Sequence, residues 1–267
     1  MSEDATPRAL ADRITPLCGF NISALSYADS LSLMQDRLRS GKGGWVLTVN
    51  LEILSTARLD PDYRRLIQGA DVVVADGMPF VWASRLKRGV SPIPERTTGS
   101  DLSGDLIRNH PLDRIAIIGG ANPPQALRAL QIEEHDEMFI FDQKVDMRDE
   151  ALDALIGKVR DHGADLIFVA LGVPKQDVVA AKIREQIPNA LILGVGGTFE
   201  LIAGLKPRAP MWMRMSGLEW LWRLYVEPRR LWRRYLLLYW VGLGFLVDDV
   251  LQGPKARALA RSAQQRR

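Results

Sequence analysis

Cysteine and histidine are both scarce in this chain of 267 residues, which has one cysteine, Cys18, and three histidines. A single cysteine excludes a disulfide framework and a cysteine-based metal site, and it fits a reducing compartment. The histidines, His110, His135 and His162, have neither metal-ligand nor catalytic-triad spacing. We therefore expect them on the surface, and we expect no metal site.

Long apolar runs are absent as well. The run Tyr235–Val247 has 13 uncharged residues, whereas a membrane-spanning helix needs roughly 20. We expect this run to lie in a membrane interface or to pack on the body as a helix that closes the core. Residues 1–20 are polar and lack the apolar stretch of a signal peptide, so we expect a body that stays in the cytoplasm.

Charge is distributed unevenly along the chain. From Lys206 onward there are 13 Lys and Arg against 4 Asp and Glu, whereas the preceding residues have 22 against 28. A cationic, aromatic tail on an acidic body predicts docking on an anionic membrane surface. Large aliphatic residues interrupt the charges, so we expect no nucleic-acid contact. Five of the seven tryptophans lie in this tail: Trp212, Trp220, Trp222, Trp232 and Trp240.

Short apolar runs alternate with helical patterns in the rest of the chain. This alternation predicts a Rossmann-like α/β fold, a mostly parallel sheet with helices on both faces. The predicted strands are Trp45–Val49, Val72–Ala75, Ile115–Ile118, Met138–Phe141, Leu166–Leu171 and Leu191–Val195. The predicted helices include Pro61–Gln68, Pro123–Gln131, Asp149–His162 and Pro174–Gln186.

Proline and glycine in the segment 204–210 indicate a boundary between the body and the tail. We therefore expect an N-terminal segment over residues 1–43, an α/β body over 44–205, and a basic, amphipathic C-terminal appendage over 206–267. We expect the appendage either to complete a site in its own chain or to pack on a second subunit of a homo-oligomer. The sequence does not distinguish between these two arrangements.

Polar residues follow the predicted strands where each strand ends, and ligands of such sheets bind at those ends. Asp76 directly follows an apolar strand, so it is either a general base or a cap of the next helix. Asp60 and Asp62, which resemble a metal clamp, are better interpreted as a helix cap. Other polar or glycine-rich strand ends contain Thr48, Asn50, Gly119, Gly172, Lys175, Gln176, Gly194, Gly196, Gly197 and Glu200.

The glycine turns at Gly119 and at Gly194–Gly197 feed into helices, where backbone N–H groups attract phosphate. Tight packing of strand against helix explains such turns equally well. Glu200 is either a carboxylate that accepts bonds from ribose hydroxyls or an exposed residue favoured by the helix dipole.

Taken together, these motifs resemble the WecG/TagA/CpsF family of bacterial glycosyltransferases, glycosyltransferase family 26. The resemblance runs from about Trp45 to Tyr235. Its motifs are Thr48-Val-Asn50, Ala-Asp76-Gly77, Pro94-Glu-Arg96-Thr-Thr-Gly99-Ser-Asp101, Gly172-Val-Pro-Lys175-Gln176, Gly194-Val-Gly-Gly-Thr-Phe199, Arg208-Ala-Pro210 and a final segment that begins at Gly217-Leu-Glu219-Trp220 and reaches Arg229.

The resemblance implies an inverting, metal-independent transfer of a sugar from a UDP-sugar to a saccharide linked to polyprenyl diphosphate. The donor sugar is of N-acetylmannosamine type or glucose, and the product belongs to cell-surface polysaccharide or exopolysaccharide. No cofactor is implied besides the UDP-sugar donor. The enzyme is expected to be peripheral, at the cytoplasmic face of the bacterial membrane.

The resemblance also implies residue roles. Asp76 is the general base, and the Gly194–Glu200 turn is part of the nucleotide site. The pocket residues are Thr48, Asn50, Arg96 and Gln176, and the arginines for the diphosphate are Arg223, Arg230 and Arg233. The chain departs from the family pattern at Asp177, where Glu is usual, and at Glu200, where Asp is usual; both keep the charge.

Two other functions fit parts of the sequence. An oxidoreductase on the same sheet would need a G-x-G-x-x-G motif after the first strand, which here ends Thr-Val-Asn. A non-catalytic membrane adaptor would explain the tail but would leave the polar strand ends without a role.

Overall fold

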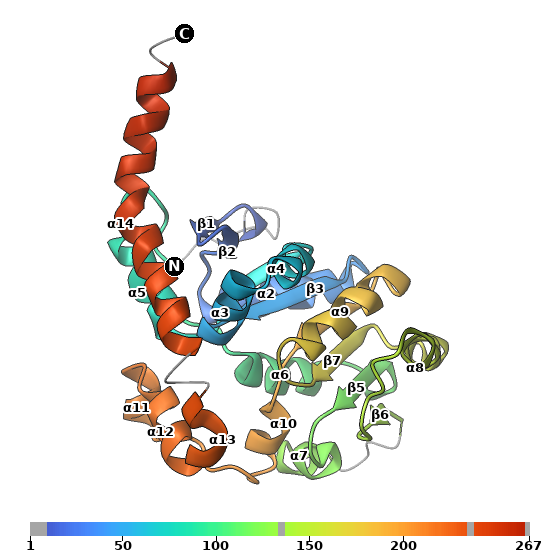
Figure 1. Cartoon of the computed structure of the whole chain (residues 1–267). Coiled ribbons are helices and arrows are strands. Elements are labelled where there is room, and N and C mark those ends of the chain that lie inside the picture. The colour runs from blue at the N-terminus through green and yellow to red at the C-terminus, as the bar shows by residue number, and fades with distance from the viewer. Residues whose placement is uncertain (1–9, 133–136, 234–237, 265–267) are drawn as a thin grey trace, which may run out of the picture.

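The computed structural model describes residues 10–132, 137–233 and 238–264. A parallel sheet lies at its centre (Figure 1). Its six strands have the order β4-β3-β8-β7-β5-β6. The α/β prediction is confirmed, and each predicted strand is observed to within one residue. The strands are β3 (Gly44–Val49), β4 (Val72–Ala75), β5 (Ile115–Gly119), β6 (Phe139–Phe141), β7 (Leu166–Ala170) and β8 (Leu191–Gly194).

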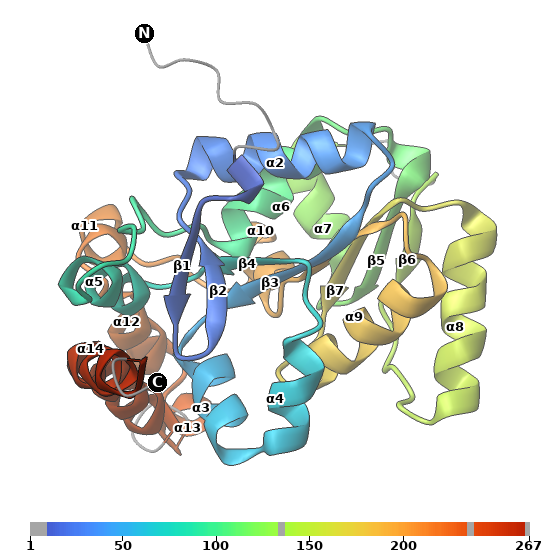
Figure 2. The ribbon, with the colours of Figure 1, turned by 90° about the horizontal axis from the view of Figure 1, so that it is seen from above.

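Helices cover both faces of the sheet (Figure 2). On one face lie α3 (Leu51–Leu59), α4 (Pro61–Ile67), α8 (Asp149–His162) and α9 (Lys175–Gln186). On the other lie α2 (Tyr27–Arg39), α6 (Gly99–Arg108), α7 (Pro123–Ala129) and α10 (Thr198–Ile202). A short 3-10 helix, Leu112–Arg114, precedes β5. The four helices predicted from the sequence are all present.

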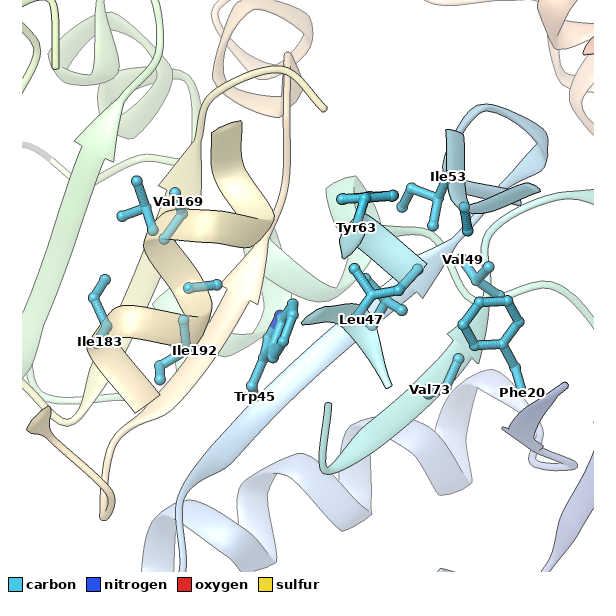
Figure 3. Packing of buried hydrophobic residues seen from close by; sticks show 14 of the residues in the cluster. Phe20, Trp45, Leu47, Val49, Ile53, Tyr63, Val73, Val169, Ile183 and Ile192 are labelled. Carbon is cyan, nitrogen blue, oxygen red and sulfur yellow. The ribbon is translucent and has the colours of Figure 1, made fainter. Parts of the chain in front are cut away.

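The two faces of the sheet bury separate apolar clusters because successive strand residues point to opposite sides. In β3, Trp45, Leu47 and Val49 pack under α3, α4 and α9, while Val46 packs under the opposite layer. Figure 3 shows the first of these clusters. Every residue of β3, β5, β7 and β8 is buried, as strands covered on both sides require.

Side-chain caps begin several helices at the ends of strands or loops. The Asn50 side-chain oxygen accepts hydrogen bonds from two N–H groups at the start of α3, and Thr98 caps α6. Asp60 accepts from the N–H groups of Asp62 and Tyr63, so the helix-cap interpretation of this pair is confirmed.

Two features differ from the sequence-based expectations. An antiparallel hairpin of β1 (Ile14–Leu17) and β2 (Phe20–Ser23), which was not predicted, packs beside β4. His110 and His162 are half-buried rather than on the surface: His110 Nε2 lies 2.6 Å from Asp165 Oδ1, and His162 packs on Phe139. His135 lies outside the described residues.

Beyond the body, the chain forms α11 (Met211–Met215), α12 (Glu219–Val226), α13 (Pro228–Arg233) and α14 (Tyr239–Gln264). The described part of the predicted apolar run, from residue 238 onward, packs on the body, because α14 lies along α3 and places Leu246 in the core. At Gly242 a Cβ atom would lie 2.6 Å from the Ser55 hydroxyl, so only glycine permits this close approach. None of the described helices has the length and apolarity to cross a bilayer.

Candidate active site

A cavity of about 790 Å³ opens at the carboxyl ends of β3, β4, β7 and β8. Its floor is formed by residues at or just after those strands, including Thr48, Asp76, Gly172 and Gly194. Helix α5 (Met78–Leu86) and the appendage helices α12 and α14 form its walls. The carboxyl edge of a parallel sheet is where ligands of this architecture bind.

Asp76 lines this cavity together with Arg96, Glu219 and Arg223. Its N–H donates to the Val49 carbonyl at 2.8 Å, which extends the β3–β4 ladder by one residue. The interpretation of Asp76 as a helix cap is wrong, because the cap residue of α5 is Gly77 and no side chain caps that helix. Asp76 lines the cavity, and its carboxylate does not cap α5.

Burial raises the pKa of Asp76 from 3.8 to about 6. Four charged groups then adjust it: Arg223 and Arg96 lower it, and Glu219 and Asp101 raise it. The side chain is partly accessible within the cavity, yet protein surrounds it closely enough for desolvation to dominate. A carboxyl group with such a pKa is ionised near neutral pH and can still accept a proton readily.

Glu219 of α12 joins the appendage to the body at this site. Its Oε2 accepts a hydrogen bond from Arg96 at 2.9 Å, and its Oε1 accepts one from Arg223 at the same distance. Burial works to raise the pKa of Glu219, but the two arginines lower it below its ordinary value. The half-buried carboxylate of Glu219 thus holds two guanidinium groups near Asp76, Arg96 from the body and Arg223 from the appendage.

Hydrogen bonds link the end of β3, the turn after β8 and the start of α9 at the floor of the cavity. The Thr48 hydroxyl donates to the Gly194 carbonyl at 3.2 Å, and the Gly196 N–H donates to Gln176 Oε1 at 3.0 Å. Because Gly196 uses its N–H in this way, that group is not available to a phosphate. Asn50 uses its side-chain oxygen as the cap of α3, which leaves only its amide NH2 to serve a ligand.

A buried carboxylate lies directly behind Gln176. Asp177 is fully buried and accepts a hydrogen bond from the Tyr63 hydroxyl at 2.7 Å. Burial raises the pKa of Asp177 to about 6, while the Tyr63 hydroxyl and the Gln176 amide work to lower it. The arrangement ties α4 to the start of α9 and fixes the backbone from which Gln176 reaches the glycine turn.

Glu200 and Lys206 also line the cavity, near the glycine turn after β8. Glu200 Oε2 is buried and has no hydrogen-bond partner within the described residues. Lys206 lies 3.6 Å from Glu227, which draws the linker toward α12. An unsatisfied carboxylate oxygen at a cavity wall is suited to accept a hydrogen bond from a ligand hydroxyl.

The cavity brings together eleven of the residues predicted as site residues: Thr48, Asn50, Asp76, Arg96, Gly172, Gln176, Gly194, Gly196, Gly197, Glu200 and Arg223. Gly119 and Lys175 are not among its lining residues. A Cβ atom at Gly119 would lie 2.6 Å from Leu171, so the tight-packing interpretation of this glycine holds. The side chains of Arg230 and Arg233 lie outside the described residues.

Sequence reasoning gave no role to Glu219 or Lys206. The ion pair of Glu219 with Arg223 could have been predicted, since the two residues lie four positions apart on one helix face. Its pairing with Arg96, 123 positions away, has no local signature.

The parallel sheet, with polar residues at its carboxyl edge, is the architecture of an α/β enzyme that binds a small ligand at its strand ends. Residues 15–255 match the model of the glycosyl transferase WecG/TagA/CpsF family, so the chain belongs to that family. The protein is accordingly a glycosyltransferase of cell-surface polysaccharide synthesis, which acts with a nucleotide-sugar donor and a glycan acceptor. The oxidoreductase and adaptor alternatives are not compatible with this membership.

Proposed function

We propose that the protein is an inverting, metal-independent glycosyltransferase. It moves a sugar of N-acetylmannosamine type, or glucose, from a UDP-sugar to a saccharide linked to polyprenyl diphosphate. The observation that carries the proposal is a single carboxylate, Asp76, whose pKa is raised to about 6 and which faces a cavity lined by Arg96 and Arg223. This combination supplies a base and cationic groups in one place.

The reaction asks two things of such a site. As the acceptor hydroxyl attacks the anomeric carbon, Asp76 takes its proton while the bond from that carbon to the UDP oxygen breaks. The departing diphosphate develops negative charge, which Arg96, Arg223 and Lys206 are placed to stabilise. Attack from the face opposite the leaving group inverts the anomeric centre, and three side-chain cations allow the step to proceed without a divalent ion.

The nucleotide is proposed to lie along the glycine turn after β8. Glu200 then supplies a buried carboxylate oxygen for a ribose hydroxyl, and Gln176 holds the turn in place through Gly196. Thr48 ties the end of β3 to the same turn through the Gly194 carbonyl. These contacts favour a pocket formed before the donor binds.

The appendage is proposed to dock the enzyme on an anionic membrane, where a lipid-linked acceptor is found. Trp212 and Tyr225 are 64% and 78% exposed, as aromatic rings at a membrane interface would be. Arg223 belongs to the same chain as Asp76 and lines the same cavity, which supports completion of the site within one chain.

Replacing Asp76 tests the proposal. We expect Asp76→Asn to lose about 10²- to 10⁴-fold in turnover, the usual contribution of a general base, while it still binds UDP. Transfer of radiolabelled sugar to membranes that carry the acceptor measures turnover, and protection against thermal unfolding by UDP, with none by NAD, measures binding. Asp62→Asn is the matched control, because Asp62 is an exposed aspartate outside the cavity.

Retained turnover in Asp76→Asn would remove Asp76 from its role. Full activity after exhaustive chelation supports independence from metal, and activity restored only by a divalent cation would contradict it.

A further inference from the structure

The cavity extends well beyond the charged residues, along an apolar trough between α5 and α14. These helices lie side by side in both views (Figures 1 and 2). Helix α5 starts two residues after Asp76, so its apolar face begins at the proposed base itself. The trough is lined by Met78, Trp82 and Leu86 of α5 and by Leu243, Val247 and Leu251 of α14.

The spacing of these residues places them on one face of each helix. On α14, residues 243, 247 and 251 recur every fourth position, and on α5 residues 78, 82 and 86 do the same. Eight residues of helix rise about 12 Å, so each wall is long enough to contact a few isoprene units. Leu86 and Leu251 remain 71% and 65% exposed, so the trough has apolar surface that is open to a ligand.

The trough is preformed, because polar contacts behind it hold the two helices together. Lys87 Nζ lies 2.6 Å from Asp249 Oδ2, and both side chains are largely buried. The Cys18 N–H donates to the same carboxylate at 3.0 Å. Lys87 directly follows Leu86, and Asp249 lies between Val247 and Leu251, so the ion pair fixes the spacing of the walls without entering the cavity.

We propose that this trough binds the first isoprene units of the lipid-linked acceptor, with its saccharide at Asp76 and its own diphosphate between the saccharide and the trough. The apolar walls, continuous with two arginines and a base, are complementary to an amphipathic molecule with an anionic head and an aliphatic chain. The identity of that lipid rests on the proposed function. The trough places the saccharide beside Asp76 and guides the chain from the enzyme along α14.

Direct binding of farnesyl diphosphate tests the trough independently of catalysis. The probes are farnesyl diphosphate and inorganic diphosphate, measured with the full chain in solution without membrane, by calorimetry or by quenching of tryptophan fluorescence. We expect farnesyl diphosphate to bind at least about tenfold more tightly, because its chain buries apolar surface in the trough.

Two substitutions that introduce a charge, with a matched control, test whether farnesyl diphosphate binds in the trough. Leu86→Glu and Leu251→Glu should each remove most of the tenfold preference, with affinity for UDP unchanged. Leu59→Glu should keep the preference. Leu59 and Leu86 are the last residues of helices of nine residues each, both strongly exposed, and only Leu86 lines the cavity.

Several results would overturn the trough. One such result is equal affinity of the unsubstituted protein for farnesyl diphosphate and inorganic diphosphate. Another is that Leu59→Glu loses as much of the preference for farnesyl diphosphate as Leu86→Glu and Leu251→Glu do. A change of oligomeric state in Leu86→Glu or Leu251→Glu would show instead that a second copy covers the apolar walls. If farnesyl diphosphate binds preferentially but no sugar is transferred, the trough proposal is supported and the proposed function is contradicted. If sugar is transferred but the protein shows no preference for the isoprenoid chain, the proposed function is supported and the trough proposal is contradicted.

Discussion

Asp76 illustrates how a buried carboxylate costs stability. Its pKa is raised from 3.8 to about 6, so the folded protein binds more protons than the unfolded chain between these values. The stability of the protein therefore falls as pH rises through this window, by about 3 kcal/mol for a shift of two pKa units. Above the window, the buried charge remains as a constant penalty.

Replacement of Asp76 by asparagine is expected to stabilise the fold near neutral pH. The free energy of unfolding of Asp76→Asn should exceed that of the unsubstituted protein by about 3 kcal/mol above pH 6 to 7, because no charge is then desolvated. The difference should shrink as pH falls and vanish below about pH 3, where Asp76 is neutral in the folded and in the unfolded chain. Urea unfolding of both proteins across pH measures this, and a difference that does not change with pH would contradict the burial of the charge.

Asp76 could be identified from the sequence because it directly follows the apolar residues Val72–Ala75, and a carboxylate there has to lie at a strand end. Gly119 had the same kind of position but does not line the cavity, because its turn is filled by Leu171 and Ala170. A strand end therefore indicates an edge of the sheet, while only packing shows which ends face a cavity.

Among the elements, α12 has the closest influence on the proposed chemistry. Glu219 raises the pKa of Asp76 and Arg223 lowers it, although both are on this one helix. The helix therefore sets the proton affinity of the base through two opposing charges, and its position matters as much as the identity of the base.

Substitution of the two α12 residues should shift the pH profile in opposite directions. The acid limb of kcat/KM reports the pKa of the base in the free enzyme. Glu219→Gln removes a negative charge and should move the limb to lower pH, while Arg223→Met removes a positive charge and should move it to higher pH. The double variant should return close to the original value. Shifts of the same sign in both single variants would show that the base is not Asp76.

The elements of the body could be predicted where their patterns are long and simple. Strands buried on both faces, such as Leu166–Ala170, form continuous apolar runs that stand out from the helices around them. The hairpin of Ile14–Leu17 and Phe20–Ser23 alternates over only four residues per strand, too short for a clear period. The position of α14 on α3 depends on close approach at Gly242, which no periodicity reveals.

The whole molecule separates its charges, with an acidic body and a cationic appendage. The separation and the aromatic residues of the appendage were evident from composition alone, because neither depends on the fold. Composition could not show that the appendage divides its tasks: α12 lines the cavity through Glu219 and Arg223, the start of α14 closes the core through Leu246, and Trp212 and Tyr225 stay exposed.

This division predicts how the protein behaves with vesicles. The full chain should sediment with vesicles that contain anionic lipid and not with neutral ones, since each basic residue near such a surface contributes about 1 kcal/mol. Binding should weaken strongly between 0.1 and 1 M salt, where the screening length falls from about 10 to about 3 Å. Trp212→Ser with Tyr225→Ser should weaken it further, and Leu59→Ser, an exposed residue of the body, should not.

Comparing a membrane-embedded acceptor with a soluble one distinguishes the proposed role of the docking residues from that of the trough. Removal of Trp212 and Tyr225 should lower transfer to an acceptor embedded in vesicles and leave transfer to a short-chain acceptor in solution unchanged, because the catalytic cavity does not include them. Leu86→Glu should impair both, since Leu86 lines the trough that we propose for the lipid. Loss of activity toward the soluble acceptor in the Trp212 and Tyr225 variant would mean that the exposed aromatics hold α12 in place rather than contact the membrane.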